Sequence, residues 1–152
     1  MVWFMSKEKS IEMAESFLRR VRNKLEEAKS HLNSCNYPES ISASMECMEL
    51  SIKAIFLLLQ EKYPKRHEFK DEEFMKVLEK VPKELEYLNF PRLFLISKFW
   101  LNLYTIAKYG QEKFGVGPEK LFKKDEAELA LKHAEECKHA ASMLESYVKY
   151  GR

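Results

Sequence analysis

Apolar residues recur every three or four positions through most of the chain, which is the spacing of one face of an α-helix. The pattern is clearest near the two ends, at Ile11, Ala14, Leu18, Val21, Leu25, Ala28 and Leu32, and at Ala127, Ala130, Ala134, Cys137, Ala141, Leu144 and Val148. The second set consists mostly of small residues, so a neighbouring helix can approach closely. The sequence predicts two long amphipathic helices that form walls of a bundle.

Three further helices are predicted between these walls from proline and glycine boundaries. They cover residues 38–62, 71–81 and 91–109, and their boundary residues are Pro38, Pro82, Pro91 and Gly110. Asp125 is the expected N-cap of the last helix, and Gly151 follows its end. No segment has a convincing strand pattern, and the connections are short. The expected fold is all-α, a five-helix up-and-down antiparallel bundle.

The helix predicted over residues 38–62 is apolar around most of its circumference. Such a helix is central in a bundle, or is covered in part by a second subunit. One narrow polar stripe contains Ser42, Glu46, Glu49, Lys53 and Gln60. Glu49 and Lys53 have the i,i+4 spacing and order that favour an ion pair. The pair either lies on the solvent-facing edge, which the frequency of exposed pairs favours, or faces a cleft and contacts a ligand.

The helix predicted over residues 91–109 has apolar residues on two sides. The predicted core face is Leu95, Ile96, Phe99, Leu103, Ile106 and Ala107. Phe94 and Leu101 then lie on the far side, among polar residues. Two large apolar residues seven positions apart on a polar face predict a contact between subunits of a homodimer. The alternative is a helix that one chain covers on both sides.

Composition restricts the classes of protein. The chain has 152 residues, 45% of them hydrophobic and 33% charged, which is typical of one globular domain. We expect that domain over residues 10–148, with tails at 1–9 and 149–152. The net charge of +2 lacks the basic excess of a dedicated nucleic-acid binder. Cys47 and Cys137 lie in helical patterns, so we expect buried free thiols. With neither a signal peptide nor a membrane-spanning run, the expected location is the cytoplasm.

Familiar catalytic and metal-binding patterns are weak. His133 and Cys137 are four residues apart, with His139 nearby, but no second pair supplies the other zinc ligands. We therefore expect neither a metal nor a cofactor. His31 and His67 are far in sequence from any Ser or Cys in a nucleophile-like context. The loop at residues 115–118 contains two glycines but lacks the Lys-Ser/Thr pair of a P-loop.

A basic cluster follows the second predicted helix. It contains Lys62, Lys65, Arg66, His67 and Lys70, interleaved with Tyr63 and Phe69. Basic and aromatic residues together are typical of surfaces that contact nucleic-acid phosphates and bases. More often such a cluster is a solvated loop, and the acidic residues at 68 and 71–73 dilute its charge.

Several short motifs, taken in order, resemble the HEPN domain family, and stand-alone archaeal members in particular. The matching segments are residues 37–41 and 51–55, a Glu followed by Lys-Ala at Glu49 and Lys53-Ala54, and Ala107-Lys108-Tyr109-Gly110. An alanine-rich acidic helix closes the match, which covers about residues 10–148. The resemblance implies a five-helix bundle that forms a dimer.

The resemblance also implies two functional styles. Some family members resemble toxin–antitoxin endoribonucleases that use an Arg followed four to six residues later by a His. Others are non-catalytic partners, often of minimal nucleotidyltransferases, with proposed nucleotide binding. No arginine of this chain has a histidine at that distance. Lys108 and Tyr109 stand where the histidine would be, and a phenol is a poor base at neutral pH.

We therefore expect no catalytic residues and a non-catalytic domain that binds a nucleotide, a protein partner such as a nucleotidyltransferase, or both. The expected ligand site is a pocket of Glu49, Lys53, Tyr104, Lys108 and Tyr109, which could hold a phosphate and stack a base. RNA is a further expected ligand with less support, and no membrane contact is expected. The alternative is a metal-independent, toxin-like endoribonuclease with a degenerate active site.

Overall fold

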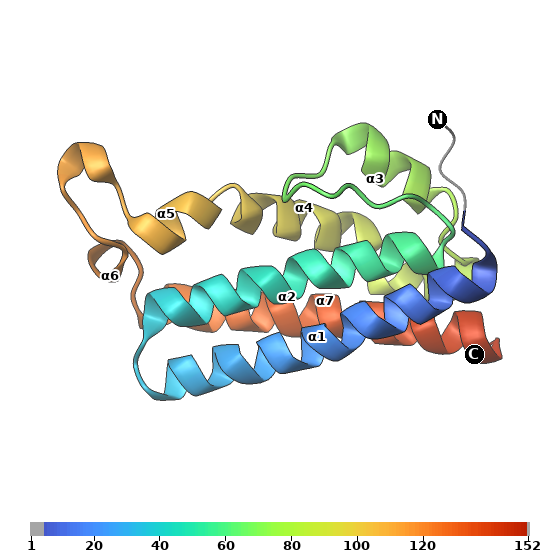
Figure 1. Ribbon diagram of the computed structural model, residues 1–152, viewed down its shortest axis with the longest axis horizontal. Coiled ribbons are helices and arrows are strands. Elements are labelled where there is room, and N and C mark those ends of the chain that lie inside the picture. The colour runs from blue at the N-terminus through green and yellow to red at the C-terminus, as the bar shows by residue number, and fades with distance from the viewer. Residues whose placement is uncertain (1–4, 152) are drawn as a thin grey trace.

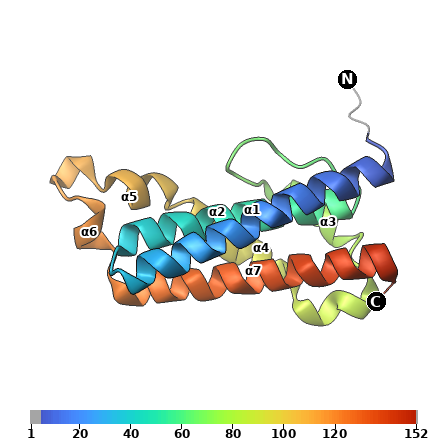
Figure 2. The same ribbon diagram turned by 60° about the horizontal axis from the view of Figure 1, so that its bottom comes forward.

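The computed structural model describes residues 5–151, and these residues form helices and turns with one isolated β-bridge, between Gln111 and Val116. The helices run alternately up and down along the long axis (Figures 1 and 2). This confirms the all-α bundle. In chain order the elements are α1 (Lys7–Asn33), α2 (Tyr37–Leu58), α3 (Asp71–Leu78), the 3-10 helix η1 (Lys83–Leu88), α4 (Phe90–Leu101), α5 (Tyr104–Tyr109), the 3-10 helix η2 (Glu112–Phe114), α6 (Pro118–Leu121) and α7 (Lys124–Tyr150).

Helix α2 lies at the centre of the bundle, as its apolar circumference predicts. It packs against α1, α7, α4 and α5, and almost all of its residues are buried. The small residues of α7 allow the close approach: Ala127, Ala130 and Ala134 are fully buried. The Cys47 thiol lies 3.8 Å from the Ala134 carbonyl oxygen, across this contact. Packing against other helices of the same chain therefore accounts for the burial of α2.

Two predicted helices end earlier than expected. Helix α2 stops at Leu58 rather than near Lys62, because Gln60 has a left-handed φ of 62°. The Glu61 N–H then bonds back to the Phe56 carbonyl oxygen at 2.8 Å, which closes the helix end. Helix α3 ends at Leu78 and leaves Val81 in a turn. The early end of α2 lengthens the loop over residues 59–70, which runs back along the bundle (Figure 1).

The helix predicted over residues 91–109 is divided. Asn102 and Leu103 form a turn in which the Leu103 N–H bonds to Trp100, only three residues back, at 2.9 Å. Gly110 ends α5 and Gly151 ends α7, as expected. Asp125 is not the N-cap of α7. The N-cap is Lys123, two residues earlier, so the helix begins at Lys124, and the Glu126 carboxylate accepts the Lys123 N–H at 2.8 Å.

The predicted dimer residues Phe94 and Leu101 lie inside the protomer, with exposed fractions of 1% and 6%. The Phe94 ring stacks on Phe74 with centroids 4.5 Å apart. Ser97 lies at the centre of this buried face, where its hydroxyl donates to the Phe94 carbonyl at 2.9 Å. The prediction that Phe94 and Leu101 lie on an exposed polar face was therefore wrong. Ser97 can be buried beside them because its hydroxyl is hydrogen-bonded within its own helix and does not require solvent.

The exposed apolar residues of α4 are instead Leu95 and Phe99, at 66% and 59%, which the sequence had assigned to the core. The predicted tails overlap residues 1–4 and 152, which lie outside the described residues, whereas Lys7 already belongs to α1. A search of residues 5–151 finds no helix with the length and hydropathy needed to cross a membrane.

The three thiols should differ sharply in reactivity. Cys35 is exposed, whereas Cys47 and Cys137 are buried. Burial raises the pKa of Cys47 to about 12 and also raises the pKa of Cys137, so neither forms a reactive thiolate. We expect the native protein to release one equivalent of thionitrobenzoate from Ellman's reagent quickly and the denatured protein to release three. Rapid release of more than one equivalent from the native protein would contradict the burial of the other two thiols.

One contact between α4 and α7 should make stability depend on pH. The indole N–H of Trp100 donates to His133 Nδ1 at 2.9 Å, and burial lowers the pKa of His133. Below pH 6.5, the unfolded chain takes up a proton that folded His133 does not, so the free energy of unfolding falls as the pH falls. The uptake of one full proton would change the free energy of unfolding by about 1.4 kcal/mol per pH unit. Because solvent screens this half-buried ring, we expect a smaller change.

The measurement is urea unfolding at pH 7.5 and 5.5 for the wild type and for His133→Gln. The variant keeps an acceptor but cannot titrate, so it should lose less stability between the two pH values. Equal losses in both proteins would contradict the inference.

Candidate functional site

An ion pair on α2 forms the base of the candidate site. Lys53 Nζ lies 2.9 Å from Glu49 Oε2, and each side chain is only 9% exposed. The interpretation as a solvent-facing edge is therefore wrong. A buried carboxylate and ammonium need partners, and each supplies part of what the other needs. The cation also lies 5.9 Å from the centre of the Tyr63 ring, in the loop over residues 59–70.

His67 connects this pair to α5. Its Nδ1 lies 2.7 Å from Glu49 Oε1, so one carboxylate holds both Lys53 and the imidazole. The imidazole stacks on Tyr104 with centroids 4.9 Å apart and planes 20° from parallel. Lys108 Nζ lies 4.5 Å from the centre of the same tyrosine ring. We call these five residues, Glu49, Lys53, His67, Tyr104 and Lys108, the His67 array.

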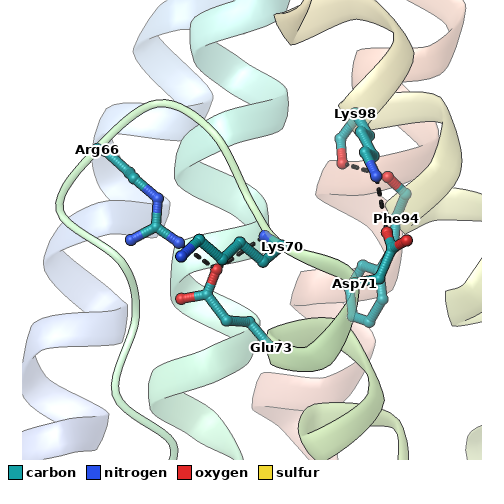
Figure 3. A network of polar contacts seen from close by, with 7 residues as sticks. Arg66, Lys70, Asp71, Glu73, Phe94 and Lys98 are labelled. Carbon is teal, nitrogen blue, oxygen red and sulfur yellow. Dashed lines mark hydrogen bonds and ion pairs between the residues drawn. The ribbon is translucent and has the colours of Figure 1, made fainter.

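Contacts on both sides of His67 fix the loop that carries it. Phe69 is buried, and its ring packs against Phe56 at 5.6 Å. Arg66 pairs with Glu73, whose carboxylate also accepts the Lys70 N–H at 2.8 Å at the start of α3 (Figure 3). A second ion pair, Lys98 to Asp71 at 2.7 Å, ties the same corner to α4 (Figure 3). His67 is therefore an exposed side chain on an anchored loop.

The array contains two lysine cations, Lys53 and Lys108, and the Glu46 carboxylate lies close enough to Lys108 to favour its charged form. The side-chain contact with Tyr104 raises the pKa of Lys108, so this ammonium stays charged at neutral pH. Within residues 5–151, no carboxylate forms an ion pair with Lys62, Lys65 or Lys108. These three cations can attract an anionic ligand.

Tyr109, the fifth residue of the predicted pocket, is not part of the array. It is 67% exposed and lines a cavity of about 450 Å³ between α1, α2, α5 and α6. Lys108 borders this cavity too, but four carboxylates line it, from Glu27, Glu39, Glu46 and Glu119. These carboxylates repel phosphate, so the array is the better anion site. Four of the five predicted residues thus lie together, and Tyr109 lies apart.

Sequence reasoning missed His67 as a site residue. Eighteen positions separate it from Glu49, so no local spacing connects the two. The available signal was the basic cluster itself, ending in an apolar anchor at Phe69. His133 and Cys137 of the considered zinc site are not assembled with other ligands: no group of three His, Cys, Asp or Glu side chains among the described residues is arranged to hold a metal ion.

Comparison with known proteins identifies the family. The family model for the HEPN domain matches residues 14–144. The chain belongs to the HEPN family. The earlier resemblance is thereby confirmed. The HEPN features Glu49, Lys53 and Lys108 are three of the five residues of the array, whereas His67 is outside the motifs that the resemblance used.

A relative in Methanocaldococcus jannaschii bears the name "putative toxin" and is 29% identical over 132 residues, covering 83% of this chain and 84% of that protein. A crystal structure of a Thermus thermophilus protein has the same fold, with a TM-score of 0.65 and 19% identity, and covers 86% of this chain and 97% of that chain.

Proposed function

We propose that this HEPN domain binds a phosphate-bearing nucleotide, free or within single-stranded RNA, against the His67 array. The observation that carries the proposal is the shared carboxylate of Glu49. The carboxylate forms an ion pair with Lys53 and accepts a hydrogen bond from His67, so its negative charge is buried and is balanced by the Lys53 ammonium. The Lys108 ammonium remains available to a phosphate.

The rings of the array add a second kind of contact. His67 and the half-buried Tyr104 are already parallel, and every nucleobase has a face that can stack on such a pair. The cations at Lys62 and Lys65 extend the basic surface along the loop, in the direction that a longer nucleic-acid backbone would follow. A free nucleotide and a short RNA therefore use the same phosphate contacts, and the RNA adds more of them.

Calorimetric titration with ATP, GTP and a ten-nucleotide single-stranded RNA tests this proposal. We expect binding of at least one ligand, and a loss of affinity of about tenfold in Lys108→Ala, the size of one charged hydrogen bond. Lys76→Ala on α3 is the matched control, since it removes an equal charge from an exposed helix and should bind like the wild type. Absence of binding by all three ligands to the folded protein would refute the proposal.

We also propose a homodimer through the outer face of α4. Leu95 and Phe99 are one helical turn apart and both exposed, and the half-buried Ile96 lies beside them. Sedimentation equilibrium should give twice the chain mass for the wild type and the chain mass for the double variant Leu95→Asp/Phe99→Asp. The alternative is that a different protein, such as a nucleotidyltransferase, binds this outer face of α4. A monomeric wild type at micromolar concentration would refute the dimer.

A further inference from the structure

The geometry points to a second binding site, for a free amino acid with an aromatic side chain, in the cavity between η1, α4 and α7. The cavity has a volume of about 520 Å³. Small-molecule sites in proteins usually have volumes of about 300 to 1,000 Å³. The cavity shares no residue with the His67 array, so this inference goes beyond the proposed function and is tested separately from it.

Three elements supply the walls of this cavity. Its α7 wall consists of residues 132, 135, 136, 139 and 140, which have the spacing of a single helix face. The 3-10 helix η1 contributes Tyr87 and Leu88, and the beginning of α4 contributes Arg92 and Leu93. Leu93 and Ala140 are buried and Leu88 is half-buried, so the inner part of the cavity is apolar.

Contacts between the three elements hold these walls in place. The Tyr147 hydroxyl donates to the Glu84 carboxylate at 3.0 Å, which ties η1 to α7 (Figure 2, where η1 is yellow-green). The Asn89 side chain accepts the Arg92 N–H at 3.3 Å, and the Arg92 guanidinium pairs with Glu136 of α7 at 2.5 Å. Because these contacts form within the protein, a ligand does not have to order the walls, and its affinity is not reduced by that cost.

The charged groups of the cavity balance. Arg92 and Lys132 are cations, and Glu135 and Glu136 are anions. Two carboxylates repel a simple anion such as phosphate, and two cations repel a simple amine. A ligand that carries both a carboxylate and an ammonium can pair each of its charges with an opposite charge of the protein. The cavity therefore favours a zwitterion.

The spacing of the available charges fits an α-amino acid. Among residues 5–151, Lys132 and Glu135 form no ion pair, and Arg92 uses only one nitrogen of its guanidinium for Glu136. Lys132 and Glu135 are three residues apart on one helix face, so their side chains are neighbours. An α-carbon that bears both a carboxylate and an ammonium can reach both of them at once.

Tyr87 selects the side chain of the ligand. It is 68% exposed, and within the described part of the chain no other aromatic ring stacks on it. An aromatic side chain can stack on this ring and be removed from water against Leu88 and Leu93. In the inferred complex the ligand carboxylate lies against Lys132, its ammonium against Glu135, and its ring beside Tyr87.

Titration of the isotope-labelled full chain with L-phenylalanine, followed by amide chemical shifts, tests this site. We expect saturable shifts at η1, at the beginning of α4 and along residues 132–140. L-Phenylalanine amide and N-acetyl-L-phenylalanine each lack one of the two charges, and they also represent the first and last residues of a peptide. Each should bind about tenfold more weakly, the size of one charged hydrogen bond. Glycine, which lacks the ring, should also bind more weakly than L-phenylalanine.

Two variants assign the charges. Lys132→Ala should weaken binding of L-phenylalanine by about tenfold and leave binding of the amide unchanged, because the amide has no carboxylate. Glu135→Gln should weaken binding of L-phenylalanine and leave binding of the N-acetyl compound unchanged. Both positions are exposed, so both variants should fold normally. Lys124→Ala and Glu128→Gln are the matched controls, since they remove the same charges from α7 outside the cavity and should bind like the wild type.

The aromatic wall is tested by Tyr87→Ala, which should weaken binding of L-phenylalanine by about fivefold or more. Absence of saturable shifts with millimolar L-phenylalanine would overturn the inference. Binding of the amide or the N-acetyl compound as tightly as the free amino acid would also overturn it, because the site would then recognise one end of a peptide. Nucleotide binding at the His67 array is measured with other ligands and other variants, so neither result bears on the proposed function.

Discussion

Replacement of Phe94 by alanine is expected to lower the free energy of unfolding by about 3 to 5 kcal/mol, the range for large aromatic side chains in cores. Its ring is 1% exposed and packs between Phe56, Phe74 and Phe90. Truncation leaves a cavity that these rings cannot fill without losing their own contacts. Phe94 therefore contributes to the stability of the protomer, where the sequence had predicted a contribution to a dimer.

The matched control is Leu95→Ala, at the next position of the same helix. Leu95 is 66% exposed, so its truncation should change the stability of the protomer by only about 0.5 kcal/mol. Urea unfolding at two protein concentrations separates the roles: the Phe94→Ala effect should not depend on concentration, whereas any effect through a dimer must. A larger effect of Leu95→Ala than of Phe94→Ala at low concentration would reverse the assignment of the two faces.

Helix α4 shows where periodicity stops being informative. It carries two apolar stripes, and either could face the core by spacing alone. Helix α3 settles the choice, because the Phe74 ring stacks on Phe94. No pattern within the helix contains that information. By contrast, α1 and α7 each have one apolar stripe, and most of their buried residues are those that the spacing predicts, with Ala14, Leu18, Ala134 and Cys137 among them. The differences lie at the margins of the stripes, where Ser10 and Ala140 are also buried and the predicted Ile11, Leu32 and Val148 are half-buried.

In the candidate site, too, helical spacing predicts some of the residues that lie together and not others. Glu49 and Lys53 are one turn apart on one helix, and so are Tyr104 and Lys108, so each pair could be predicted to share a face. Tyr109 is one residue beyond Lys108 and therefore lies about 100° further around α5. Both residues border the acidic cavity, and Lys108 in addition lies over the Tyr104 ring. His67 belongs to a loop, where side-chain direction follows from tertiary contacts rather than from any period.

His67 also changes how the missing family motif is understood. From the sequence, the absence of a histidine after an arginine indicated a domain without a base. The folded chain places an imidazole over α2 and α5 from another element, beside the family's own Glu49 and Lys108. A motif search along one helix cannot detect a group that a loop delivers.

Replacement of Glu49 by methionine should be the most damaging change at the array, at about 3 to 5 kcal/mol, because it leaves a buried ammonium without its partner. Lys53 is 9% exposed, and its remaining aromatic contact, with Tyr63 at 5.9 Å, cannot substitute for a carboxylate. His67 loses its partner in the same variant. Urea unfolding of Glu49→Met against the wild type at pH 7.5 measures the cost.

The double variant Glu49→Met/Lys53→Met should recover most of that loss, since two apolar side chains of similar length can fill the space of a buried ion pair. Glu128→Met is the control for the charge change, because Glu128 pairs with Lys124 at 3.7 Å in an exposed i,i+4 arrangement. It should cost less than about 1 kcal/mol. If Glu49→Met were as mild as Glu128→Met, or if the second substitution added to the damage, the buried pair would not be what holds α2 beneath the loop that carries His67.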